Sequence, residues 1–133
     1  MNKKIVVVDD DVVTLQTLEK ILVKSDFYVF SAPDGEAAYQ LVKKERPDIL
    51  VSDMLIPKLH GLELCRKVKE DPELAKTKVI LISAVYKSQS FRGEMQQSGA
   101  DGFLEKPINT AELMIRIFKI YMEIATEEEG NSP

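Results

Sequence analysis

The sequence predicts an α/β fold, a doubly wound sheet of five parallel strands flanked by five helices. Short apolar segments rich in β-branched residues alternate with segments whose apolar residues recur every three or four positions. Several of the short segments are apolar throughout, as expected of strands covered by helices on both faces. Strands that alternate with helices pair in parallel through right-handed crossovers, so five such units form one doubly wound domain.

The expected strands are the β-branched segments themselves. They span residues 5–8, 28–30, 49–51, 79–82 and, with a weaker pattern, 102–104. The segments between them have helical spacing, carried by Leu15, Leu18 and Leu22, by Ala38, Leu41 and Val42, and by Leu64 and Val68. The fourth helix is weakly marked, because Phe91 and Met95 are nearly its only apolar pair and Gly93 lies between them. Low local stability suits an element that changes conformation.

The last helix, over residues 111–125, is the longest of the set. Asn109 followed three positions later by Glu112 is typical of a capping box at its start. It carries two apolar stripes, one formed by Leu113, Ile117, Ile120 and Ile124 and a second by Met114, Ile115, Phe118 and Met122. A surface helix usually needs one stripe, so the second indicates either a partner or one wide buried face.

Length and composition indicate one domain without special stabilisation. The 133 residues fit a domain over residues 1–125, followed by a polar tail or the start of a linker at 126–133. A net charge of −4 without a basic cluster argues against direct nucleic-acid binding. The apolar run at residues 5–8 is too short for a signal peptide or a membrane span. We therefore expect a cytoplasmic protein, in which Cys65 is a small apolar residue in a reducing environment.

Polar residues stand where the predicted strands end. Asp9, Asp10 and Asp11 follow the first strand, Asp53 the third, Ser83 the fourth and Lys106 the fifth. The carboxyl ends of parallel strands meet at one edge of the sheet, where open α/β sheets bind ligands. Clustered carboxylates repel one another unless a cation compensates them. Oxygen ligands without His or Cys favour Mg²⁺, although Asp11 also suits the N-cap of the first helix.

These groups fit phosphoryl-transfer chemistry. A carboxylate can attack phosphorus and form an aspartyl phosphate. The transferring group carries negative charge on its oxygens, so catalysis requires mainly positioning and charge neutralisation. The Lys106 ammonium and the Ser83 hydroxyl are the groups that the sequence supplies for this purpose, beside a metal ion.

Four sequence blocks in order and spacing identify a family. They are Val8-Asp9-Asp10, Ser52-Asp53-Met54-Leu55-Ile56-Pro57, Leu81-Ile82-Ser83-Ala84 and Gly99-Ala100-Asp101-Gly102-Phe103-Leu104-Glu105-Lys106-Pro107. With these blocks the chain resembles the receiver domain of bacterial two-component response regulators, the CheY-like superfamily. The resemblance covers about residues 3–124 and implies a flavodoxin-like sheet of strand order 2-1-3-4-5.

The resemblance also implies roles for individual residues. Asp53 is the phosphoacceptor and, with Asp9, Asp10 and the Leu55 backbone carbonyl, binds Mg²⁺, for which Mn²⁺ can substitute. Lys106 binds the phosphoryl group and precedes a proline with a cis peptide bond, which X-Pro permits. Ser83 is the switch hydroxyl and Phe103 the switch aromatic residue. Leu55 and Val85 are apolar where many relatives are polar, so we expect slow self-dephosphorylation, because neither side chain orients water.

The resemblance implies a signalling switch rather than an enzyme with a separate substrate. The expected partners are a sensor histidine kinase or a histidine phosphotransfer protein upstream, and a target or output domain downstream, reached through the fourth and fifth helices. A homodimer is a further candidate. His60, in a loop, is expected to be exposed and non-catalytic, which excludes a phosphodonor role for this chain. The alternative is a degenerate receiver that binds proteins without phosphorylation; a flavin carrier is disfavoured because the aspartates would repel its phosphate.

Overall fold

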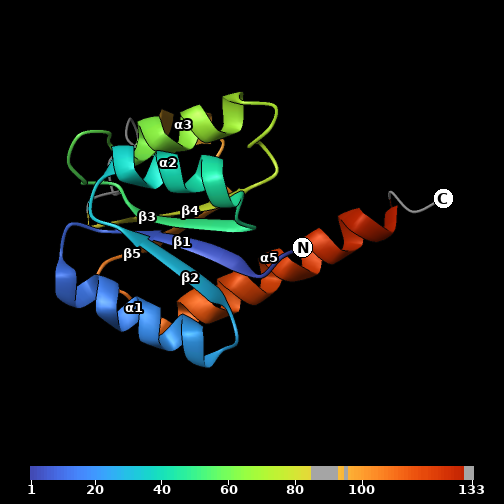
Figure 1. Cartoon of the computed structure of the whole chain (residues 1–133), viewed down its shortest axis with the longest axis horizontal. Helices are drawn as coiled ribbons and strands as arrows, with labels where there is room; N and C mark the ends of the chain where they lie inside the picture. Colours follow the sequence, from blue (N-terminus) through green and yellow to red (C-terminus); the bar gives the residue numbers. More distant parts are fainter. Residues whose placement is uncertain (85–92, 95, 131–133) are drawn as a thin grey trace.

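The computed structural model describes residues 1–84, 93–94 and 96–130 (Figure 1). Its strands are β1 (Lys4–Val8), β2 (Tyr28–Ala32), β3 (Ile49–Asp53), β4 (Lys78–Ser83) and β5 (Gly102–Glu105). Its helices are α1 (Val12–Lys24), α2 (Gly35–Glu45), α3 (Gly61–Glu70) and α5 (Thr110–Gly130). Each strand contains the segment expected from the sequence and extends it at one end or both.

The five strands form one parallel sheet in the order β2-β1-β3-β4-β5, which confirms the predicted topology. β1 lies between β2 and β3, so the chain leaves β1 toward one edge of the sheet and later continues from β3 toward the other. This reversal is the topological switch point, where open α/β sheets bind ligands. The register pairs Val8 of β1 with Ser52 of β3, which brings Asp9 and Asp53 to the same edge.

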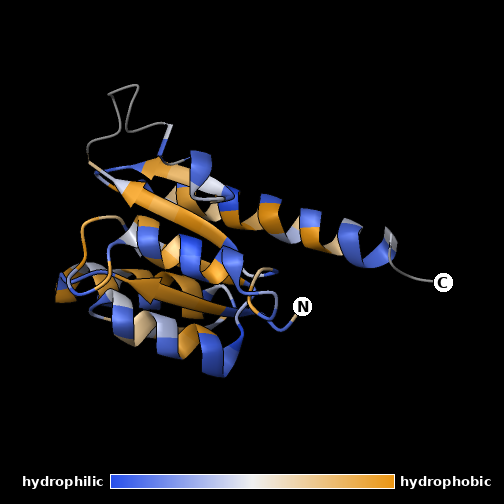
Figure 2. Ribbon diagram, turned by 90° about the horizontal axis from the view of Figure 1, so that it is seen from above, coloured by the Kyte–Doolittle hydropathy of each residue, from blue (hydrophilic) through white to orange (hydrophobic). Residues whose placement is uncertain are grey.

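Helices cover both faces of the sheet. α2 and α3 lie on one face and α1 and α5 on the other (Figure 1). The residues of β1 alternate between the two layers: Val6 and Val8 pack under α2 and α3, and Ile5 and Val7 under α1 and α5. In Figure 2 the strands are mostly hydrophobic, as expected of strands covered on both faces, whereas the helices carry both hydrophobic and hydrophilic residues. Cys65 is fully buried in the first of these layers, as expected.

Side-chain caps fix the starts of three helices. Asp11 accepts a hydrogen bond from the Val13 amide and caps α1, as predicted. Asp34 caps α2 by accepting from the Ala37 amide. Asn109 accepts from the Glu112 amide at the start of α5, where the capping box was expected. Such caps satisfy amide groups that the first turn of a helix leaves without partners.

The segment expected to form the fourth helix lies partly outside the described residues. The described residues contain four helices rather than the five expected. Residues 93–94 and 96–97 are helical, whereas Phe91, Met95 and Val85 lie outside the described residues. In the described parts of the chain, no helix combines the length and apolarity needed to cross a membrane.

The last helix is longer than predicted. α5 continues through Gly130, so residues 126–130, expected outside the last helix, are helical. Glutamates are good helix formers, and two of them bind the body of the domain. Glu127 pairs with Lys78 at 3.0 Å and Glu128 with the amino group of Met1 at 2.8 Å. Whether the functional domain ends near residue 125 stays a prediction.

The two apolar stripes of α5 have different surroundings. Leu113, Ile117, Ile120 and Ile124 are buried against the sheet. Ile115, Phe118 and Met122 are 60%, 54% and 70% exposed, and only Met114 of the second stripe packs against the core. The second stripe is therefore an exposed apolar surface and not part of one wide buried face.

Candidate functional site

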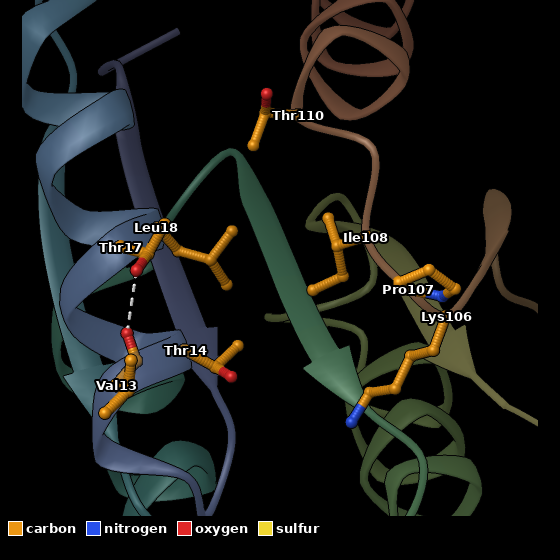
Figure 3. Close-up of a pocket in the computed structure, with 8 residues that line it drawn as sticks. All are labelled: Val13, Thr14, Thr17, Leu18, Lys106, Pro107, Ile108 and Thr110. Carbon is orange, nitrogen blue, oxygen red and sulfur yellow. Dashed lines mark hydrogen bonds between the residues drawn. The ribbon is translucent and has the colours of Figure 1, made fainter.

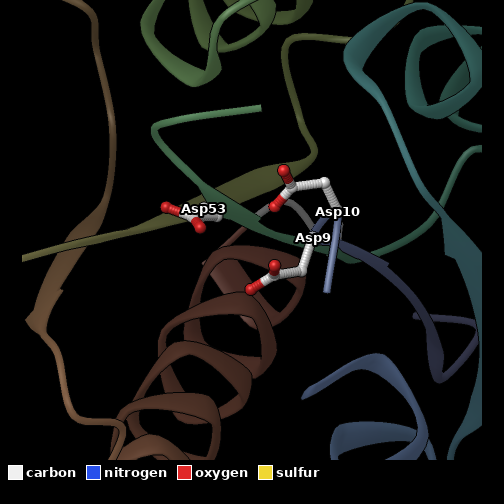
Figure 4. Close-up of side chains that lie close together, drawn as sticks. All are labelled: Asp9, Asp10 and Asp53. Atoms are coloured by element: carbon white, nitrogen blue, oxygen red, sulfur yellow. The ribbon is translucent and has the colours of Figure 1, made fainter. Parts of the chain in front are cut away.

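Three carboxylates meet at the carboxyl edge of the sheet. Asp9 and Asp10 follow β1, and Asp53 is the last residue of β3 (Figure 4). One oxygen from each lies within 4.8 Å of the others. Asp9 and Asp53 are only 2% and 5% exposed, whereas Asp10 is exposed. The sequence prediction that these aspartates lie together is confirmed.

Among the described residues, Lys106 brings the one ammonium group that pairs with this cluster. It follows β5, and its Nζ lies 2.6 Å from Oδ2 of Asp53 and 3.8 Å from Oδ2 of Asp9. The other oxygen of Asp53 accepts from the Leu55 amide at 3.2 Å, and Oδ1 of Asp9 accepts from the Asp11 amide at 2.9 Å. Each buried carboxylate is thus oriented by one backbone amide and faces Lys106.

The electrostatics of the cluster are unbalanced. Burial raises the pKa of Asp9, and the neighbouring Asp53 and Asp10 act in the same direction against the Asp11 amide and Lys106. Burial alone lowers the pKa of Lys106, but its hydrogen bond and charge interactions with Asp53, and the charges of Asp9 and Asp10, raise it overall. Lys106 is therefore firmly protonated, and the carboxylates attract further positive charge.

The donor set fits a hard divalent cation. The three residues offer carboxylate oxygens only, which suits Mg²⁺ or Mn²⁺ and not a metal that prefers sulfur or imidazole. An additional cation would compensate the repulsion among carboxylates that Lys106 alone does not balance. Asp9, Asp10 and Asp53 are the residues that could hold it.

The remaining predicted residues border the cluster. Ser83, at the end of β4, is 4% exposed, and its carbonyl accepts from the Lys106 amide at 3.0 Å. The Lys106–Pro107 bond is cis, as the resemblance implied. Phe103 is partly buried and packs against the core layer under α2 and α3. The side chain of Leu55 is 66% exposed, and His60 is exposed just before α3.

A groove opens beside Lys106. It has a volume of about 310 Å³ and lies between α1 and the segment that joins β5 to α5 (Figure 3). Its lining is mainly apolar or hydroxyl-bearing and comprises Val13, Thr14, Thr17, Leu18, Lys106, Pro107, Ile108 and Thr110. Val13, in this lining, is 67% exposed, and its chain neighbour Val12 is 64% exposed. Sequence reasoning missed this groove, although two adjacent valines after the Asp11 cap were a visible signal.

Two glycines near the acceptor were also missed. Gly61 begins α3 and Gly35 begins α2, and both lie against the loop that follows Asp53. Their common place at a helix start was visible in the sequence, but their contacts depend on the tertiary fold.

Asp48 lies at the opposite edge of the sheet from the carboxylate cluster, where it accepts a hydrogen bond from the Tyr121 hydroxyl at 2.9 Å.

The fold and the site at its switch point define a doubly wound α/β domain with a carboxylate cluster, suited to a cation, at one sheet edge. Comparison with known proteins identifies the family of this domain. The profile of the response regulator receiver domain matches residues 5–118, and the chain belongs to this family. Within two-component systems, this family forms the receiver domains of response regulators.

Individual relatives agree with this assignment. The chain is 32% identical to response regulator PleD of Caulobacter vibrioides over 98% of its length, which is 30% of that protein. It is 33% identical to the alkaline phosphatase synthesis transcriptional regulatory protein PhoP of Bacillus subtilis over 88% of its length and 48% of that protein. The chain thus spans at most about half of these two curated relatives.

Solved structures show the same fold. A receiver domain protein (CheY-like) from Methanospirillum hungatei superposes with a TM-score of 0.87 at 25% identity, covering 96% of this chain and 99% of that one. The receiver domain of the Francisella response regulator 1452 gives 0.82 at 30% identity, covering 91% and 98%.

Proposed function

We propose that this receiver domain accepts a phosphoryl group on Asp53 from the phosphohistidine of a sensor histidine kinase or phosphotransfer protein, in a Mg²⁺-dependent reaction. An oxygen of Asp53 forms a bond to phosphorus as the phosphorus–nitrogen bond breaks, and the imidazole leaves as the neutral base after taking up a proton. The observation that supports this most strongly is the 2.6 Å ion pair of Lys106 with Asp53 inside a cluster of three carboxylates.

Each group at the edge has a defined task. The Leu55 amide orients Asp53 by its 3.2 Å hydrogen bond. Lys106, already beside the attacking oxygen, neutralises charge on the transferring group. Bound Mg²⁺, held by Asp9, Asp10, Asp53 and the Leu55 carbonyl, supplies further charge neutralisation at the phosphoryl oxygens. The Ser83 hydroxyl is the remaining donor toward these oxygens.

The donor protein must bring its histidine to this edge. Its surface therefore rests on the rim of the site, where the groove beside Lys106 and the exposed Val12 and Val13 offer apolar contact area. The exposed Leu55 side chain offers no hydrogen bond to an attacking water. We therefore propose slow hydrolysis of the aspartyl phosphate in the isolated domain.

The output follows from the charge that phosphorylation adds. The new oxygens draw Ser83 and Lys106 toward them, and Phe103, which is only partly buried, moves into the space that Ser83 leaves. This shift changes the surface around β5 and α5. The exposed Ile115, Phe118 and Met122 are the contact area for a downstream target or output domain, or for a second copy of the chain.

Intact mass measurement tests the proposal. The protein and its Asp53→Asn variant are incubated with Mg²⁺ and a small acyl-phosphate donor. We expect one added phosphoryl group in the wild type only, and none with a chelator. After the donor is removed, the phosphoryl group should persist for much longer than seconds. No gain in folded wild type would favour a phosphorylation-independent binding module, and equal gain in Asp53→Asn would place the acceptor elsewhere.

A further inference from the structure

The loop after the acceptor, residues 54–60, is held by the starts of two helices. It joins β3 to α3, and its second residue is Leu55. We propose that Gly35, the first residue of α2, is a positioning residue for the Mg²⁺ binding that phosphoryl transfer requires, because α2 contacts the far end of this loop. The inference rests on the proposed function, since it concerns the geometry of the same site.

Close approach of the backbone explains the two glycines. A Cβ at Gly61 would lie 2.7 Å from the Asp53 carbonyl oxygen and 2.8 Å from the Met54 Cα. A Cβ at Gly35 would overlap the Leu59 carbonyl oxygen and lie 2.6 Å from the Leu59 Cβ. No side-chain rotation relieves these overlaps, because the atoms belong to the backbone or to Cβ. Any side chain at position 35 must therefore displace the loop or α2.

The loop contains a tight turn that α2 holds in place. The Pro57 carbonyl accepts from the Leu59 amide at 2.8 Å and from the Gly35 amide at 3.1 Å. Lys58, between Pro57 and Leu59, has φ +69°, a left-handed conformation that is unfavourable for a residue with a Cβ. Its Nζ lies 3.5 Å from Oδ2 of Asp34, the N-cap of α2. A strained turn persists only where its surroundings determine it.

A displacement at Leu59 reaches the acceptor through packing. Met54, Ile56 and Leu59 are 4%, 3% and 5% exposed, so the loop is inserted in the core and cannot yield at one residue alone. The Leu55 amide holds Oδ1 of Asp53 at 3.2 Å. A shifted loop therefore changes the geometry of the Leu55 backbone relative to Asp53, while every proposed metal ligand remains present.

The Mg²⁺ dependence of phosphorylation tests Gly35. The rate with acetyl phosphate is measured against MgCl₂ concentration for the wild type, Gly35→Ala and a control, Gly93→Ala, whose Cβ meets none of the described residues within 4 Å. We expect Gly35→Ala to raise the half-saturating Mg²⁺ concentration about tenfold, the scale of lost support around metal ligands, with a maximal rate close to wild type. The control should match wild type.

A second substitution tests the contact between the start of α2 and the turn at residues 57–59. Lys58→Gly removes the cost of the left-handed turn and lets the loop adjust, so in the Gly35→Ala background it should recover part of the Mg²⁺ affinity. Unchanged Mg²⁺ dependence in a folded Gly35→Ala protein would overturn the inference. Absence of any Mg²⁺ dependence in the wild type would instead overturn the proposed function.

Amide exchange in the wild type covers the case in which Gly35→Ala does not fold. Coupling is reciprocal, so Mg²⁺ should slow exchange of the Gly35 amide, which donates to Pro57. The Glu112 amide, bonded to Asn109 at the start of α5, is the control and should not change. Equal exchange at Gly35 with and without Mg²⁺, in protein that binds Mg²⁺, would overturn the inference.

Discussion

At the amino edge of the sheet, Asp48 accepts from the amides of Asn2 and Lys3, at 3.0 and 2.8 Å, and from the Tyr121 hydroxyl at 2.9 Å. At the carboxyl edge, Asp53 accepts from one amide and shares Lys106 with Asp9, with Asp10 close by. The first carboxylate joins three segments of the chain, whereas the second stands among like charges. The same residue type thus stabilises the fold at one edge and leaves negative charge available for a cation at the other.

The largest expected effect is stabilisation by Mg²⁺ through the carboxyl edge. A ligand that binds only the folded state adds about 2.7 kcal/mol to the free energy of unfolding at one hundred times its Kd. We expect this gain in urea unfolding of the wild type. Asp53→Asn should lose most of it, while Asp48→Asn should keep it. An equal gain in Asp53→Asn would show that the cation binds elsewhere.

The two aspartates should respond oppositely to replacement by asparagine. Asp48→Asn loses acceptor capacity for three donors, and we expect the free energy of unfolding to fall by about 2 kcal/mol. Asp53→Asn relieves repulsion with Asp9 and Asp10, so without Mg²⁺ it should be at least as stable as wild type. Similar losses in both variants would contradict the difference between the edges.

Tyr121 gives the amino edge a distinct pH dependence. Burial, and then the Asp48 carboxylate, raise the pKa of this phenol above its ordinary value. Its contribution is therefore complete below about pH 10 and is lost as the pH rises toward the folded-state value. Tyr121→Phe should lower the free energy of unfolding by about 1 kcal/mol at neutral pH. Urea unfolding should show a shallower decline above about pH 10 than in wild type, and an unchanged slope would refute the assignment.

The sequence predicted what depends on local pattern. β-branched runs gave the strands, and residues after their ends gave Asp9, Asp10, Asp53, Ser83 and Lys106, because parallel strands must share an edge. Contacts that join distant segments could not be predicted. Asp48 meets Tyr121 across 73 positions of the chain, and the place of Gly35 against Leu59 depends on how α2 packs. The helical extension to Gly130 is accompanied by ion pairs with distant residues, such as that of Glu127 with Lys78.

The two edges of the sheet differ in what their carboxylates contribute to stability. We expect clustered charge at the carboxyl edge to lower the free energy of unfolding without a cation, and hydrogen-bonded charge at the amino edge to raise it. Buried charges in proteins are usually compensated by partners. Uncompensated buried charge is expected at a functional site where a ligand supplies the opposite charge.

One NMR titration tests the central claim most directly. Amide shifts of the intact chain are followed as MgCl₂ is added. We predict saturable changes at Asp9, Asp10, Asp53, Leu55 and Lys106, with Asp48 and Asp101 at the amino edge unchanged. Saturable changes confined to the amino edge, or none at the carboxyl edge, would contradict a cation-dependent phosphoacceptor site.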